Sequence, residues 1–230
     1  MTIELDTMTV DIAADTPLSG ELIAAVLAVA TAAEDAAAAG RQATTVLTIR
    51  GAREGAEFPW PGAVPVGLVG KWENAVRRLE QAPTPIVAIV DGDAYGPAAE
   101  LLLIADYRVV SAGAVFRLAA VGGGTWPAMA LHRLVAQLGV SRARELAIQG
   151  RALPATVAGE RGLVDAVVEP GGESAAVGVG VALFAETVGS ELAIRRRLLL
   201  DAVNTRFEDA LGAHLAAADR TLRRTKPVER

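Results

Sequence analysis

Short apolar runs alternate along the chain with longer segments whose apolar residues recur every three or four positions. The short runs are rich in β-branched residues and are bounded by glycine and proline, which is typical of strands. We expect strands at 7–13, 44–51, 82–92, 107–113 and 163–170. We expect helices at 17–40, 71–82, 128–139, 141–150 and 154–162. Strands that alternate with helices in this way predict an α/β layer fold.

The C-terminal part of the chain lacks strand patterns. From about Val177 onward its apolar spacing predicts helix, with a break near Asn204 and a basic end. We therefore expect an α/β core over 1–175 and a helical region over 176–230, which packs either on the core or on another subunit.

Composition and charge narrow the class of protein. Of the 230 residues 52% are hydrophobic, and the formal net charge of −5 argues against a surface for nucleic acid. The absence of cysteine excludes disulfides and thiolate chemistry and fits a reducing, cytoplasmic compartment. The N-terminus does not have the pattern of a signal peptide, and the longest uncharged stretch, 118–131, is too short to cross a bilayer. We expect no membrane partner.

One carboxylate stands among apolar residues. Glu100 is the only charged residue in "PAAELLLIA" (97–105), and a helix that is apolar on all sides is usually buried. Burial raises the pKa of a carboxyl toward the range useful for proton transfer, whereas a helix N-terminus lowers it. The alternative is a structural ion pair with a buried arginine such as Arg108 or Arg133.

The residues around Glu100 carry a recognisable spacing. In "VDGDAYGPAAELLLIADYRV" (90–109), a strand leads into Gly92, a turn with Gly96, small residues, Glu100 and an apolar helix. The stretch "RARELAIQGRALPATVAGERGLVDAVVEP" (142–170) continues the match. With these motifs the chain resembles the enoyl-CoA hydratase/isomerase, or crotonase, superfamily over most of its length. The resemblance implies an α/β crotonase (ClpP/crotonase-like) fold, a spiral of repeated ββα units with a C-terminal helical region.

The resemblance implies that Glu100 moves a proton on an acyl-CoA thioester. Hydratases of the family pair this glutamate with a second one, and the matching position here is Ala120, which cannot transfer a proton. The hydration mechanism with two carboxylates therefore cannot be carried over whole. A single carboxylate can still move a proton in an isomerisation, a dehydration or a decarboxylation.

Family members also stabilise the enolate of the thioester with two backbone N–H groups, an oxyanion hole. One donor falls in the loop 58–64, where Ala63 is our first candidate and Gly62 the second; the alternative for this loop is a connector stiffened by proline. The other donor falls on Pro97, which has no N–H. Either Ala98 takes over this role or the oxyanion hole is weakened or absent.

Two tryptophans lie in Gly/Pro-rich loops that the resemblance places near the acyl group. We expect Trp60 and Trp126, with Gly123 and Gly124, to line the substrate pocket. Packing of the two rings in the core is an equal alternative.

The remaining polar clusters indicate no further chemistry. His132 and His214 lack the spacing of metal ligands, so we expect no metal, and no cofactor apart from the CoA of the substrate. The basic clusters 195–197 and 223–226 either meet CoA phosphates or form solvated helix faces, and the second is the commoner case for exposed charges.

The shortness of the chain and the segment "GGGTWPAMALHRL" (122–134) resemble the short accessory members of 3,5-dihydroxyphenylglycine biosynthesis, which act beside a type III polyketide synthase. We expect an acyl-CoA or polyketidyl-CoA substrate that is dehydrated or isomerised. The alternative is a non-catalytic partner subunit that assembles with an active homologue or with the synthase. Members of the family usually form trimers or hexamers through their C-terminal helices. An apolar stripe in this region suits either packing between subunits or a fold-back within the chain. It consists of Leu192, Leu199, Val203, Leu211 and Leu215.

Overall fold

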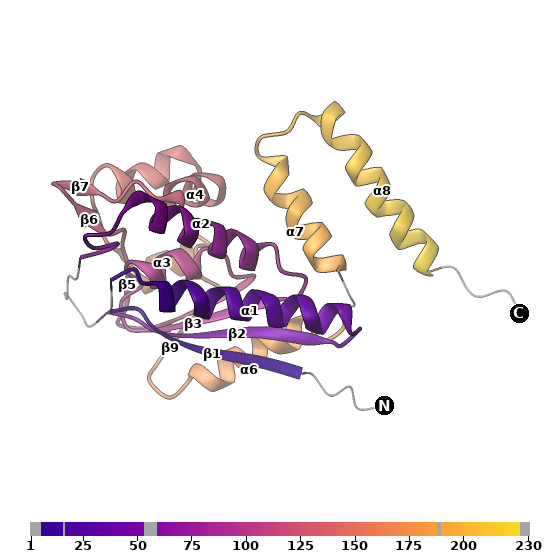
Figure 1. The fold of residues 1–230 in the computed structure, drawn as a ribbon, viewed down its shortest axis with the longest axis horizontal. Coiled ribbons are helices and arrows are strands. Elements are labelled where there is room, and N and C mark those ends of the chain that lie inside the picture. Colours follow the sequence, from indigo (N-terminus) through magenta and orange to yellow (C-terminus); the bar gives the residue numbers. More distant parts are fainter. Residues whose placement is uncertain (1–5, 16, 53–58, 188–189, 226–230) are drawn as a thin grey trace, which may run out of the picture.

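The computed structural model describes residues 6–15, 17–52, 59–187 and 190–225. Its centre is a five-stranded parallel sheet with the strand order β1-β2-β3-β4-β9 (Figure 1). The strands are β1 Asp6–Ala13, β2 Ala43–Arg50, β3 Ile86–Asp91, β4 Tyr107–Ser111 and β9 Ala166–Val168. The predicted α/β layer fold is confirmed.

The inner position of β2 and β3 in the sheet explains why their sequences are almost continuously apolar. Nearly every residue of both strands is buried, because helices or loops cover both faces of a parallel sheet. The buried hydroxyls of Thr45 and Thr84 satisfy each other through a hydrogen bond of 2.9 Å.

Helices cover both faces of the sheet (Figure 1). The first five are α1 Gly20–Ala38, α2 Val66–Glu80, α3 Pro97–Leu102, α4 Met129–Ala147 and α5 Ala155–Glu160. Helix α6, Glu173–Leu183, packs against β3, β4 and β9 on the face opposite to α1. Ser19 caps α1, since its Oγ accepts the N–H of Leu22 at 3.1 Å.

Two local expectations need correction. Helix α2 begins at Val66 rather than at 71, because Pro65 precedes a helical turn whose glycines weaken its sequence signal. The segment 119–127 is not an irregular loop but contains the strands β6 Ala120–Val121 and β7 Gly124–Thr125. Gly122 and Gly123 supply the positive φ values, 60° and 83°, that their two-residue turn requires. The two helices expected over 128–150 are confirmed: α4 spans both, and Gly139, with φ 73° and ψ 161°, is non-helical and separates them.

A second short antiparallel pair joins β5, Val115–Phe116, to β8, Leu153–Pro154. It connects the residues that follow β4 to those that precede α5.

The C-terminal helices form a hairpin that extends away from the sheet (Figure 1). They are α7 Glu191–Ala202 and α8 Phe207–Thr225, so the predicted break near Asn204 is confirmed. The guanidinium groups of Arg220 and Arg224 bind the Glu191 carboxylate and hold the two helices together. The division of the chain at 175/176 stays a prediction, and α6, which begins before this point, lies against the sheet.

Arg196 attaches α7 to the core. Its side chain is buried, and its guanidinium donates to both carboxylate oxygens of Asp106 and to the carbonyl oxygens of Glu80, Ala82 and Thr84. The expected solvent-exposed or phosphate-binding role therefore does not apply to this middle arginine of the 195–197 cluster. Arg196 instead satisfies the carbonyl groups that follow the C-terminal end of α2.

We expect Arg196→Ala to lower the free energy of unfolding by about 3 kcal/mol, because Asp106 loses its partner in a largely buried site. Arg197→Ala is the matched control, since that side chain is 78% exposed and forms only an ion pair within its own helix. Urea denaturation of both variants measures the difference. Equal stabilities would show that Arg196 does not anchor α7.

Candidate functional site

The site lies where the carboxyl ends of β2 and β3 lead into two loops that approach each other closely. A Cβ on Gly51 would lie 2.6 Å from the carbonyl oxygen of Asp93, and one on Gly92 would lie 2.7 Å from that of Ala52. Only glycine fits at both positions. This close contact fixes the turn after β3, and that turn leads directly into α3.

Glu100 projects from α3 into the core and is 3% exposed, as the sequence predicts. Two indoles hold its carboxylate. The Nε1–H of Trp60 donates to Oε1 at 2.9 Å, and the Nε1–H of Trp72 on α2 donates to Oε2 at 2.5 Å. The rings pack edge to face, with centroids 5.5 Å apart. We call Trp60 and Trp72 the indole pair.

Burial raises the pKa of Glu100 to about 7. The hydrogen bonds from the indole pair act in the opposite direction, since both donors stabilise the ionised form. The negative charge of Glu73 raises the pKa further, and the positive charge of Arg133 lowers it. A carboxyl group near neutrality is suited to gain and lose a proton at physiological pH.

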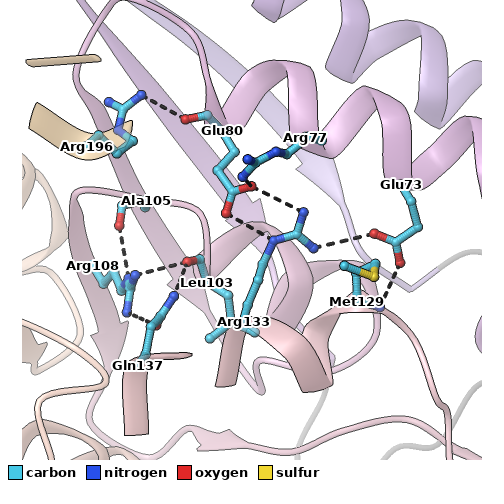
Figure 2. A network of polar contacts seen from close by, with 10 residues as sticks. All are labelled: Glu73, Arg77, Glu80, Leu103, Ala105, Arg108, Met129, Arg133, Gln137 and Arg196. Carbon is cyan, nitrogen blue, oxygen red and sulfur yellow. Dashed lines mark hydrogen bonds and ion pairs between the residues drawn. The ribbon is translucent and has the colours of Figure 1, made fainter. Parts of the chain in front are cut away.

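The alternative ion pair of Glu100 with a buried arginine is wrong for both candidates. Arg108 donates to the carbonyl oxygens of Leu103 and Ala105 and to the side chain of Gln137. Arg133 binds the carboxylates of Glu73 and Glu80 (Figure 2).

The structure places the predicted oxyanion donors at the two turns. Pro97 is the first residue of α3, and the N–H of Ala98 already donates to the carbonyl oxygen of Tyr95 at 3.1 Å. Ala63 is exposed, and the carbonyl oxygen of Gly62 accepts the N–H of Val64. Pro61, immediately before Gly62, also has no N–H to donate.

The predicted pocket residues do not lie together. Trp60 is 1% exposed and serves as a hydrogen-bond donor to Glu100, whereas Trp126 is half-buried against the apolar core. Gly123 and Gly124 are exposed in the β6–β7 hairpin. Ala120, the position of the missing second glutamate, is exposed in β6.

Trp72 on α2 belongs to the site but was missed from the sequence. Trp72 binds Glu100, and Glu73 contacts the first residue of α4. The pattern "KWENAVRRLE" indicates an amphipathic helix, in which a buried tryptophan looks like an ordinary core residue. The acidic residue beside this tryptophan, Glu73, was the one signal in the sequence that could have drawn attention to it.

Comparisons with known proteins show the family of this chain. The sequence profile described as "Enoyl-CoA hydratase/isomerase" matches residues 67–229. The chain is 45% identical over 166 residues to an "Enoyl-CoA-hydratase" of Amycolatopsis orientalis, which covers 72% of this chain and 75% of that protein. The chain belongs to the enoyl-CoA hydratase/isomerase family.

Two further comparisons concern a part of the chain and its fold. Over 112 residues it is 38% identical to a "(3,5-dihydroxyphenyl)acetyl-CoA 1,2-dioxygenase" of Amycolatopsis orientalis, 49% of this chain and 25% of that protein. The crystal structure of an enoyl-CoA hydratase/isomerase family protein from Silicibacter pomeroyi superposes with a TM-score of 0.77 over 98% of both chains, at 20% identity. The predicted crotonase fold is confirmed.

Two features are absent from residues 6–15, 17–52, 59–187 and 190–225 of this enoyl-CoA hydratase/isomerase family member. In that part of the chain every helix is too short or too polar to cross a membrane. Within the same ranges no three His, Asp or Glu side chains form a group that could hold a metal ion.

The raised pKa of Glu100 predicts a pH-dependent stability for this enoyl-CoA hydratase/isomerase family member. The Glu100 carboxyl keeps its proton to about pH 7 in the folded state and loses it near pH 4.5 in the unfolded chain, so the folded state loses stability as the pH rises between these values. The expected loss is about 3 kcal/mol. Urea denaturation at several pH values measures it.

Glu100→Gln removes the titrating group, so its stability should vary much less across this range. Glu34→Gln is the control, because the pKa of the exposed Glu34 is lowered by its hydrogen bond to Arg78 and its charge does not change there. A wild-type slope that survives in Glu100→Gln would show that another group titrates.

Proposed function

We propose that the protein binds an acyl-CoA or polyketidyl-CoA thioester and that Glu100 moves a proton during a dehydration or an isomerisation. The observation that carries this proposal is the Glu100 carboxylate itself, with a pKa of about 7 and both oxygens held by the indole pair. Fixed donors hold the carboxylate in one orientation, and a catalytic proton transfer needs such an orientation.

The substrate class is inferred from the relatives. One relative in Amycolatopsis orientalis is named for (3,5-dihydroxyphenyl)acetyl-CoA, and the more similar one from the same organism is named a hydratase. These names support an acyl-CoA substrate, and we propose a cytoplasmic role in forming 3,5-dihydroxyphenylacetyl-CoA, in secondary metabolism for antibiotic biosynthesis. CoA enters as part of the substrate, and no other cofactor is proposed.

A non-catalytic partner subunit is the second candidate function, and the turns around Glu100 favour it. Pro61 and Pro97 have no N–H, and the N–H of Ala98 is bonded to Tyr95. The turn into α3 therefore offers no free N–H at Pro97 or Ala98 for an enolate oxygen. Such a subunit would keep the fold in order to assemble with an active homologue or with a polyketide synthase.

The C-terminal hairpin supports assembly in either case. Its large apolar side chains are exposed in the single chain, and they are Leu199, Val203, Phe207, Leu211, Leu215 and Leu222. Apolar surface of this kind marks an interface. We propose a homo-oligomer, a trimer or hexamer, or a hetero-oligomer with a homologue.

Glu100→Gln separates the two candidate functions. If Glu100 moves the proton, the variant should lose about 100-fold or more of its dehydration rate on 3-hydroxyacyl-CoA and of its effect on a reconstituted polyketide synthase. Glu34→Gln, which changes an exposed carboxylate on α1, should retain both. A Glu100→Gln variant that keeps full effect on the synthase would overturn catalysis and favour the partner subunit.

A further inference from the structure

Both oxygens of the Glu100 carboxylate are occupied in this structure. Oε1 accepts the indole N–H of Trp60 at 2.9 Å, and Oε2 accepts that of Trp72 at 2.5 Å. Glu100 is 3% exposed, and each of the two tryptophans is 1% exposed. A substrate therefore reaches the carboxylate only if one of its two partners moves.

Two cavities in the described part of the chain lie away from this carboxylate. Their volumes are about 300 and 340 Å³, and they lie between α7 and the end of α2, one of them reaching α4. Glu100 lines neither cavity. A path from these cavities would also have to open through the residues that enclose Glu100.

Trp72 is fixed by the helix that carries it. It lies in the middle of α2, and the next residue, Glu73, accepts the N–H of Met129 at 3.1 Å and binds the guanidinium of Arg133 at 3.4 Å. Glu80, at the end of the same helix, also binds Arg133, at 3.1 Å (Figure 2). Withdrawal of Trp72 would separate α2 from α4 and break ion pairs between largely buried side chains, which is costly.

Trp60 lies on the surface segment 59–65, which is neither helix nor strand. Pro59, immediately before it, is exposed. Three of the seven residues in this segment are prolines, which have no N–H to bond to the rest of the protein. The N–H of Leu18 donates to the carbonyl oxygen of Pro61 at 3.0 Å and ties the segment to the residues before α1. The Trp60 indole can therefore leave Glu100 by a local change, without movement of a helix.

We propose that Trp60 occupies the place on Glu100 that the substrate takes, and that Trp72 is a positioning residue that holds the carboxylate throughout. The inference rests on the proposed function, the binding of a CoA thioester. When the thioester enters, the Trp60 indole leaves Oε1, and this oxygen then faces the reacting atoms. The bond from Trp72 to Oε2 keeps the carboxylate in its orientation. Only a ligand that reaches Oε1 offsets the loss of the Trp60 bond, so Glu100 stays covered until the substrate is bound.

The indole N–H signals of the three tryptophans test the displacement directly. Protein with nitrogen-15 in its tryptophans is titrated with butyryl-CoA and with (3,5-dihydroxyphenyl)acetyl-CoA and followed by NMR, while calorimetry measures binding. On binding, the Trp60 N–H should lose the downfield shift of a carboxylate-bound donor and exchange with solvent at least about 10-fold faster. The Trp72 N–H should keep its shift and its slow exchange. Trp126, half-buried against the core, is the internal control, and single Trp→Phe variants assign the signals.

The pH dependence of turnover separates displacement from a purely structural role. The profile of kcat/KM reports ionisation in the free protein, and that of kcat reports ionisation in the substrate complex. Each indole N–H favours ionised Glu100, so Trp60→Phe and Trp72→Phe should both move the kcat/KM profile to higher pH. Only Trp72→Phe should also move the kcat profile, because Trp60 has already left Glu100 in the complex. The charges of Glu73 and Arg133, which also act on Glu100, are the same in both variants.

The possible results distinguish this inference from the proposed function. If calorimetry shows a bound thioester while the Trp60 N–H stays on the carboxylate, or while Trp72 is released in its place, the inference is overturned and the proposed function stands. A kcat profile that moves equally in both variants overturns the inference in the same way. If neither thioester binds, to the protein alone or with the synthase, the proposed function is overturned and this inference with it.

Discussion

A carboxylate held away from water is the constraint on which the rest of this structure depends. Burial of Glu100 favours its neutral form, and the two indole N–H groups favour its ionised form, so neither state dominates strongly. An unsatisfied carboxylate in the same place would cost several kcal/mol. The indole pair makes the burial tolerable and also fixes the direction of the carboxylate oxygens.

Helix α2 connects this carboxylate to the C-terminal region. Its first half carries Trp72 and Glu73, and its last residue, Glu80, binds Arg133. Arg196 of α7 then holds the carbonyl groups at the end of the same helix. The position of Trp72, and through it of Glu100, therefore depends on the packing that also anchors the exposed hairpin.

Much of the fold follows from the sequence, because local patterns determine it. The apolar strands and the burial of Glu100 could be predicted, since each depends on residues near it in the chain. The partners of Glu100 could not, because Trp60 and Trp72 come from 40 and 28 residues away and spacing does not show which side chains meet. Arg196 was missed for a similar reason: three successive arginines do not reveal which of them faces inward.

The ionisation of Glu100 is the central claim, and the most direct test is a pH titration of the protein with carbon-13 in its glutamate side-chain carboxyls, followed by NMR. Comparison with Glu100→Gln assigns the resonance. The structure predicts that this one carboxyl changes chemical shift with a midpoint near pH 7. If the Glu100 resonance titrates below about pH 5 like an ordinary glutamate, the buried, indole-bound carboxyl described by the structure is contradicted.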